Sequence, residues 1–274
     1  MLASLIIVFR ECLEAALIVG IVLAAARDVA GRGRVVGAGI GLGVLGALVV
    51  ALFSEEITSA LSGMGQEVLN ATILLAAVVL LGWHNVWMSR HGRELSAHLK
   101  RVGSEVSGGQ RPLSALTVVV ALAVLREGSE TVLFLLGVRA GAQSSAAMLA
   151  GGLIGLVGGV AVGVAIYAGL LRLSPRHLFT ATGLLILFLA AGMASQSALY
   201  LSQAGVLPAL TPMIWDSSEI LARDSVVGEL LHLLMGYDDR PSGLQALFFA
   251  VTLVTMGFLM LTVGRTPRAV ARPA

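Results

Sequence analysis

The chain has 274 residues, of which 57% are hydrophobic and only 12% carry a charge. A water-soluble domain carries about 25% charged residues, so this composition excludes a soluble globular protein, and the apolar content excludes a disordered chain. A single cysteine, Cys12, excludes a disulfide scaffold. The net charge of +2 gives no reason to expect a nucleic acid as partner. The composition therefore indicates an integral membrane protein.

Seven hydrophobic runs are long enough to cross a bilayer, which needs roughly 20 residues. The runs predict an all-α integral membrane protein with transmembrane helices at 2–26, 35–53, 68–89, 113–138, 146–171, 178–201 and 244–264. We expect four segments along the chain. They are a first three-helix repeat with its cytoplasmic loop (1–112), a second repeat (113–201), an acidic outer loop with a short helix at 225–235 (202–243), and a seventh helix with its tail (244–274).

Basic residues gather in the segments that follow the first, third, fifth and seventh runs. Cytoplasmic segments of membrane proteins carry an excess of lysine and arginine. The charge distribution therefore predicts a multi-pass protein of the cytoplasmic (inner) membrane, with its N-terminus outside and its C-terminus inside. Anchoring on the cytoplasmic side is a sufficient reason for these basic residues, so they do not indicate nucleic-acid binding.

Two R-E-x-x-E motifs, at residues 10–14 and 126–130, lie inside the first and fourth runs. They are 116 positions apart, and the same offset pairs Gly39 of the second run with Gly155 of the fifth. Three helices separate the motifs, so the two halves would cross the membrane in opposite directions. This pattern predicts an inverted 3+3 repeat plus one C-terminal helix, which is typical of transporters with a substrate site between the halves.

Charged residues inside a membrane helix are costly and are usually functional. Residues three and four apart share one helix face, so the glutamates of both motifs can meet at one depth. Four carboxylates and two guanidiniums match a multivalent cation, and ferric or ferrous iron, manganese, magnesium and calcium all stay open. Simple pairing of each arginine with its own glutamate, or a proton relay, also stays open. The predicted metal ligands are Glu11, Glu14, Glu127 and Glu130, with Arg10 and Arg126 as supporting charges.

The two motifs and the seven runs resemble the iron permease family, which includes the fungal high-affinity ferric permease and the bacterial Efe-type iron permeases. The resemblance covers essentially the whole chain, although the residues between the charges, Cys12-Leu13 and Gly128-Ser129, depart from the frequent Gly-Leu. It implies that the glutamates bind iron on the translocation path. It also implies iron as the transported substrate, no permanently bound cofactor, and periplasmic or extracellular iron-binding or oxidase proteins as partners.

Outer acidic residues are the second part of the predicted iron path. The fungal members carry a D-A-S-E motif in the outer loop, and Asp216 and Glu219 match it. The resemblance therefore implies a second iron site in this loop. An acidic mouth also raises the local concentration of cations, and Glu55, Glu56 and Glu67 are expected on the same side as its possible extension.

Two further side chains are expected to be ordinary. His84 ends the third run near the cytoplasmic interface, where we expect an interfacial residue rather than a metal ligand at the inner exit. Cys12 lies inside the first motif, but the second motif has Gly128 there, which favours a small packing residue.

Other functions remain as alternatives to iron transport. The nearest is a transporter of another divalent metal, such as lead or manganese. An intramembrane enzyme using the buried glutamates is disfavoured, because the chain has no H-E-x-x-H motif, no serine–histidine pair and no nucleotide motif. A channel-like or structural membrane subunit is the third alternative. The sequence therefore predicts a permease rather than an enzyme.

Overall fold

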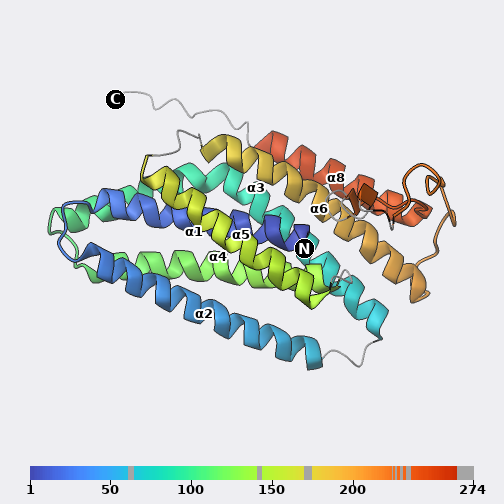
Figure 1. Ribbon diagram of the computed structural model, residues 1–274, viewed down its shortest axis with the longest axis horizontal. Helices are drawn as coiled ribbons and strands as arrows, with labels where there is room; N and C mark the ends of the chain where they lie inside the picture. Colours follow the sequence, from blue (N-terminus) through green and yellow to red (C-terminus); the bar gives the residue numbers. More distant parts are fainter. Residues whose placement is uncertain are drawn as a thin grey trace, which may run out of the picture.

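The computed structural model describes residues 1–60, 65–140, 144–169, 175–223, 225, 227–228, 231–232 and 236–263. This part of the chain is helical and contains no strand. Successive long helices run in alternating directions along the longest axis of the molecule (Figure 1). The helices are α1 (Leu2–Ala25), α2 (Arg32–Ala60), α3 (Gln66–Ser107), α4 (Ser114–Ala140), α5 (Ser145–Tyr167), α6 (Pro175–Gln203) and α8 (Gly243–Val263).

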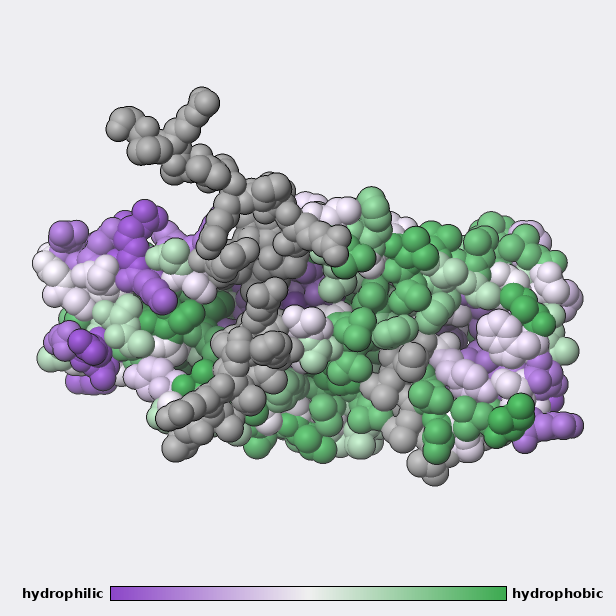
Figure 2. All heavy atoms as spheres, turned by 90° about the horizontal axis from the view of Figure 1, so that it is seen from above, coloured by the Kyte–Doolittle hydropathy of each residue, from purple (hydrophilic) through white to green (hydrophobic). Residues whose placement is uncertain are grey.

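The surface of the bundle is apolar along its central part. Large hydrophobic side chains such as Leu52, Leu153 and Val254 are more than half exposed. Figure 2 shows hydrophobic residues over the middle of the molecule and hydrophilic ones gathered toward its ends. Five of the described helices, α2, α3, α5, α6 and α8, are long and apolar enough to cross a membrane. The fold is therefore that of a helical membrane protein, and α1 and α4 are the two long helices that carry the charged motifs.

Helix α3 is longer than predicted. The sequence predicts a span at 68–89 followed by a cytoplasmic loop with a short helix. The apolar span within α3, Gln66–Trp87, agrees with the predicted span, but the helix continues to Ser107 and is about 63 Å long at about 1.5 Å per residue. Leu99, Val102 and Val106 are three and four positions apart and are buried, so this extension packs through one apolar face. The predicted irregular loop is therefore replaced, as far as Ser107, by a continuing amphipathic helix that carries the basic residues after position 89. As a result, His84 lies near the middle of α3 and not at its end.

Glycines allow two pairs of helices to approach closely, α5 on α1 and α2 on α4. A Cβ on Gly155 would lie 2.5 Å from the Leu5 carbonyl oxygen, and a Cβ on Gly43 would lie 2.8 Å from the Ala121 carbonyl oxygen. Small residues at such contacts let membrane helices pack backbone against backbone. Leu5 and Ala121 are 116 positions apart, so the contacts align Gly43, rather than the predicted Gly39, with Gly155. The second half has four fewer residues between its motif and its glycines, which shifts the correspondence by about one helical turn.

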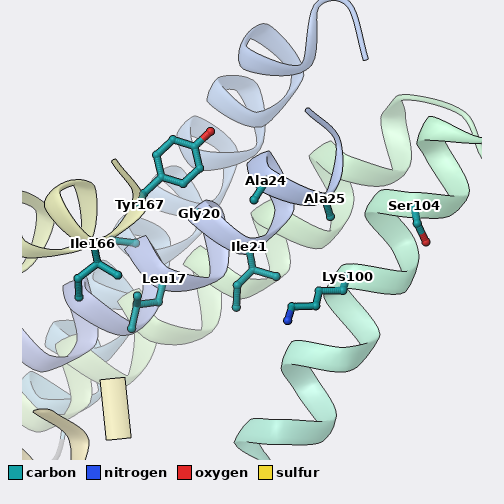
Figure 3. A pocket seen from close by; sticks show the side chains of 11 residues that line it. Leu17, Gly20, Ile21, Ala24, Ala25, Lys100, Ser104, Ile166 and Tyr167 are labelled. Carbon is teal, nitrogen blue, oxygen red and sulfur yellow. The ribbon is translucent and has the colours of Figure 1, made fainter. Parts of the chain in front are cut away.

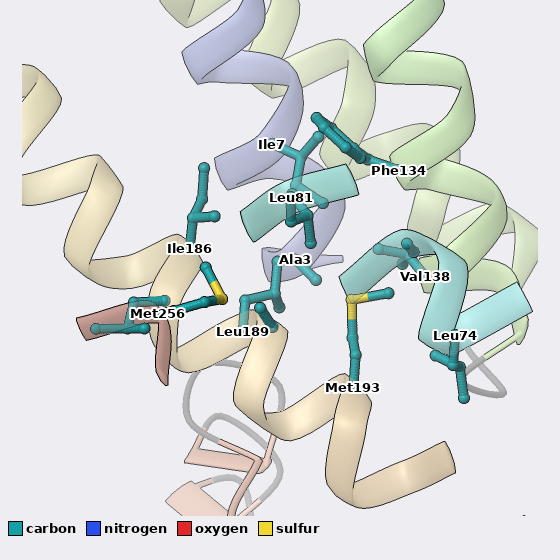
Figure 4. Packing of buried hydrophobic residues seen from close by; sticks show 13 residues of the cluster. Ala3, Ile7, Leu74, Leu81, Phe134, Val138, Ile186, Leu189, Met193 and Met256 are labelled. Atoms are coloured by element: carbon teal, nitrogen blue, oxygen red, sulfur yellow. The ribbon is translucent and has the colours of Figure 1, made fainter. Parts of the chain in front are cut away.

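Two apolar clusters occupy the core, one on each side of the charged motifs. The first includes Ile7 of α1, Leu81 of α3 and Phe134 of α4 (Figure 4). The second includes Ile18 of α1, Leu99 of α3 and Val124 of α4. On each of these three helices the charged or polar site residues lie between a member of the first cluster and a member of the second. The charged side chains are therefore enclosed by apolar packing in both directions along the bundle.

The segment between α6 and α8 folds back on itself. The Ile214 amide donates to the Pro241 carbonyl oxygen, and the Ser217 amide donates to the Asp239 carbonyl oxygen, both at 2.9 Å. Helix α8 begins with a capping box in which Ser242 and Gln245 bond each other's backbone amides. Of the predicted short helix at 225–235, only residues 225, 227–228 and 231–232 are among those described, and Ser225 Oγ accepts a bond from the Gly228 amide as a helix cap does.

The close contact between α1 and α5 gives a first testable prediction. Replacing Gly155 with valine places side-chain atoms against the α1 backbone, so we expect a loss of about 1–3 kcal/mol of stability and a lower melting temperature in detergent. Gly41→Val is the matched control, because a Cβ on Gly41 meets nothing within 4 Å. Equal melting temperatures for the two variants would contradict the tight packing of α5 on α1.

Candidate metal site

The charged side chains of α1 and α4 form two ion-paired sets. On α1, Arg10 Nη1 lies 3.1 Å from Glu11 Oε1 and Nη2 lies 3.0 Å from Glu14 Oε1, so one guanidinium bridges both glutamates. On α4, Arg126 Nε lies 3.0 Å from Glu130 Oε1 and 4.0 Å from Glu127 Oε1. Each arginine therefore pairs with the glutamates of its own helix, which is the local pairing that the sequence left open.

Helix α3 joins the two sets through His84. The imidazole Nδ1 contacts Glu130 of α4, while Nε2 lies 3.8 Å from Glu11 Oε2 and 3.7 Å from Glu14 Oε2 of α1. The His84 side chain is only 3% exposed. The imidazole therefore lies between the carboxylates of both motifs, in the middle of the bundle.

Four side chains place one potential ligand atom each within 4.8 Å of one another. Opposite ligands of a small metal ion lie about 4 Å apart, because each bond is about 2.0–2.2 Å long. The spacing is therefore close to that of a metal coordination shell. The four residues are Glu11, His84, Glu127 and Glu130. Glu14 stands just outside this group, held between Arg10 and His84.

The cluster has more negative than positive charge and too few hydrogen bonds. Both carboxylate oxygens of Glu127 and Oε2 of Glu11 are buried, and the described residues supply no N–H or hydroxyl donor within hydrogen-bond distance of them. A buried polar atom without a partner costs about 1–3 kcal/mol, and more when the group is charged. Four carboxylates face two guanidiniums, so Coulomb repulsion adds to this cost. A bound cation would offset both effects at once.

Comparison with known proteins agrees with this geometry. Residues 1–270 match the family described as the iron permease FTR1 family. The chain is 31% identical to the ferrous iron permease EfeU of Yersinia pestis over 260 residues, 93% of this chain and 91% of the relative. It is 32% identical to the ferrous iron permease EfeU of Escherichia coli O6:K15:H31, over 93% of each chain. No solved structure matches.

The chain belongs to the iron permease FTR1 family. It is a multi-pass membrane protein with a transport function and not an enzyme, and iron is its transported substrate. The resemblance seen in the sequence is thereby confirmed. The cluster of buried glutamates is the part of this permease whose chemistry suits a metal cation.

The two motifs of the permease differ in burial. The Arg10 side chain is 3% exposed, whereas Arg126 is 32% and Glu130 is 21% exposed. The Arg126 guanidinium lies 4.2 Å from the ring centroid of Trp87, a cation–π contact. Trp87 of α3 therefore serves as the platform for Arg126. The cluster therefore reaches the surface on the α4 side and is sealed on the α1 side.

His84 is the site residue that sequence reasoning misjudged. The prediction placed it at the cytoplasmic interface, because the third span was expected to end at residue 89. Its contacts with Glu11, Glu14 and Glu130 show instead that His84 lies level with both motifs. The sequence does contain an indication of this position. His84 and Trp87 are three residues apart and so share one helix face at the end of an otherwise apolar run. Cys12 faces α5, where a Cβ on Gly159 would lie 2.9 Å from the Cys12 Cβ, in agreement with a packing role.

The predicted outer acids lie apart from the cluster. Asp216 Oδ2 accepts a bond from Arg240 Nε at 3.0 Å, and Oδ1 accepts bonds from the Ser218 hydroxyl and amide. The bonds from Ser218 and the Arg240 charge lower the pKa of Asp216 to about 2. Glu219 is exposed, as are Glu56 and Glu67, while the side chain of Glu55 lies outside the described part of the chain. Asp216 is therefore engaged by its own loop, and Glu219 is the freer of the two.

A cavity of about 530 Å³ lies between α1, α3 and α5 (Figure 3). Its lining is mostly apolar, with Lys100, Ser104 and Tyr167 as polar members. No residue of either motif lines it. This cavity is therefore separate from the candidate metal site.

The two arginines give a second testable prediction. Because Arg10 bridges two glutamates with both terminal nitrogens, lysine cannot replace its planar fork, and we expect Arg10→Lys to lower iron uptake about tenfold. The hydrogen bond from Arg126 to Glu130 comes from Nε, and Arg126 is the more exposed arginine, so Arg126→Lys is expected to keep more activity. Iron uptake normalised to protein in the membrane measures both. Equal uptake by the two variants would contradict the distinct role of the Arg10 fork.

Proposed function

We propose that this permease moves iron across the cytoplasmic membrane into the cell through the cluster between α1 and α4. The single observation that carries the proposal is that both motifs, from helices far apart in sequence, bring buried carboxylates to one place. Carboxylate oxygens can replace the water lost by the cation when it leaves solvent. The proposed ligands are Glu11, Glu14, Glu127 and Glu130, with Arg10 and Arg126 as their counter-charges.

The proposal includes an inverted repeat of α1–α3 and α4–α6, with α8 as the seventh membrane span. Support comes from the contact pattern: α1 packs on α5 as α4 packs on α2. The glycine contacts match in the same way, with Gly43 against Ala121 and Gly155 against Leu5. The alternating helix directions in Figure 1 agree with opposite orientations of the two halves. The site would then lie at the interface of the halves, near the middle of the membrane.

The two apolar clusters suggest how such a site transports its cation. The cluster that includes Ile7 and Phe134 lies on one side of the site along the bundle, and the cluster that includes Ile18 and Val124 lies on the other side. Each would act as a barrier to a hydrated ion, since the cation has no polar partner there. Transport would require the clusters to open in turn. With the basic connections inside, the acidic segment between α6 and α8 faces the outside and the N-terminus is outside.

The proposed cargo is divalent iron. The relatives are named ferrous iron permeases, and a cluster with two more negative than positive side chains suits a divalent ion. In the proposal, Glu219, assisted by Asp216, collects the cation on the outer side. Periplasmic or extracellular iron-binding or oxidase proteins would deliver it.

The central site gives a third testable prediction. Glu127→Gln keeps the size of the side chain but removes a buried charge for which the described residues supply no hydrogen-bond donor, so we expect iron uptake to fall at least tenfold while the protein still inserts. Glu105→Gln is the matched control, because Glu105 pairs with Arg111 at the end of α3, away from the site. The measurement is iron uptake by proteoliposomes, normalised to inserted protein. Normal uptake by Glu127→Gln would show that the iron path lies elsewhere.

The outer loop gives a fourth prediction. Because Asp216 is bound by Ser218 and Arg240, we expect Glu219→Gln to raise the iron concentration for half-maximal uptake more than Asp216→Asn does. The maximal rate should stay unchanged for both variants, since neither touches the central cluster. An iron titration of uptake provides the measurement. Unchanged half-saturation in both variants and in their combination would mean that these acids are ordinary solvated residues.

A further inference from the structure

We propose that His84 is a ligand of the transported cation and that its imidazole selects divalent iron over harder divalent cations such as manganese, magnesium and calcium. This inference rests on the proposed function of the carboxylate cluster. It goes beyond the two motifs, because His84 belongs to neither and comes from a third helix, α3. The proposal assigns to His84 the discrimination among metals, and to the glutamates the attraction of a cation.

The position of the ring is that of a ligand. His84 Nε2 faces the gap between Glu11 and Glu14 at 3.8 and 3.7 Å, which is too far for a hydrogen bond to either. The other nitrogen, Nδ1, contacts Glu130 of the opposite motif. The nitrogen atoms thus point at carboxylates on both sides. A cation within this group would be shared between the imidazole and carboxylates of both motifs.

The surroundings of His84 hold the ring in this orientation. Phe134 packs edge-on against it, with the ring centroids 6.2 Å apart. The next residue, Asn85, donates a hydrogen bond to the Gly183 carbonyl oxygen of α6 at 3.1 Å. This bond fixes α3 against α6 at the level of the site. Because the ring is buried, packs against Phe134 and stands on a helix fixed to α6, it is pre-positioned for a cation rather than recruited by one.

An imidazole changes which metals the site prefers. Sites built only from carboxylates suit magnesium, calcium and manganese, whereas imidazole suits iron, zinc, copper and nickel. One nitrogen ligand among carboxylates therefore shifts the preference away from manganese and the alkaline-earth ions. Cobalt and zinc should compete with iron effectively, and manganese should compete weakly.

Uptake competition in proteoliposomes tests the selectivity. We compare ferrous iron and manganese uptake by the intact chain, by His84→Gln and by His98→Gln, a matched control on the exposed face of the same helix. His84→Gln is expected to lower iron uptake about tenfold and to reduce the iron-to-manganese ratio at least fivefold, while His98→Gln leaves both unchanged. Equal losses of iron and manganese uptake in His84→Gln would overturn the proposal and assign His84 to packing or to charge balance. Where the glutamine variant fails to insert, His84→Asn replaces it.

A binding measurement separates ligation from an indirect effect. Pulsed electron paramagnetic resonance of the purified protein with one equivalent of Cu²⁺ reports the nitrogen of a directly bound imidazole. We expect this signal in the intact chain and in His98→Gln, and its loss in His84→Gln. An unchanged signal in His84→Gln would contradict ligation. Normal iron uptake by Glu127→Gln would instead refute the carboxylate path itself, so the two failures are distinguishable.

Discussion

The burial of excess negative charge between two apolar clusters is the constraint on which this permease depends. Glu11, Glu14 and Glu127 are almost fully enclosed, and the two arginines compensate only half of the carboxylate charge of the motifs. Burying unpaired charge is costly in any protein and more so within a membrane. A cation bound among these carboxylates would offset that cost. The glycine contacts between α1 and α5 and between α2 and α4 hold the two charged helices in place around it.

The two motifs share a sequence pattern but differ in what surrounds them. Arg10 is enclosed and bridges two glutamates, whereas Arg126 is partly exposed and lies over Trp87 of α3. The difference arises because α3 contributes His84 and Trp87 to one side of the site. Under the proposed inverted repeat, such inequality between the halves would let the cation be accessible from one side at a time. In this structure Arg126 and Glu130 are the partly exposed members of the two motifs.

Much of the helical architecture follows from the sequence, because membrane helices are specified by long apolar runs. The predicted runs match the described helices within a few residues at most ends, and the charged motifs indicate the candidate site. Helix α3 was harder to predict, because its second half is amphipathic and its basic residues resemble those of a loop. The sequence therefore predicts His84 at the membrane interface, whereas the structure places it in the candidate site. The predicted pairing of Gly39 with Gly155 is also shifted, to Gly43 with Gly155. A constant offset of 116 positions does not account for the four fewer residues between motif and glycine in the second half.

Asp216 illustrates a different limit of the sequence. The spacing of Asp216 and Glu219 predicts paired ligands, but the hydrogen bonds from Ser218 and Arg240 depend on how residues 214–217 meet residues 239–241. Pairing between positions so far apart is set by the fold of the whole segment. Residue types therefore indicate where a cation can bind, while the tertiary contacts decide which carboxylates are free to bind it.

The central claim is that one cation binds between α1 and α4. A structure of the permease loaded with ferrous iron, with anomalous scattering recorded at the iron absorption edge, tests this claim directly. The account predicts one iron peak about 2.0–2.3 Å from carboxylate oxygens of both motifs, with Glu11 and Glu127 among the ligands. An iron peak bound by one motif alone, or none within reach of either, would contradict it.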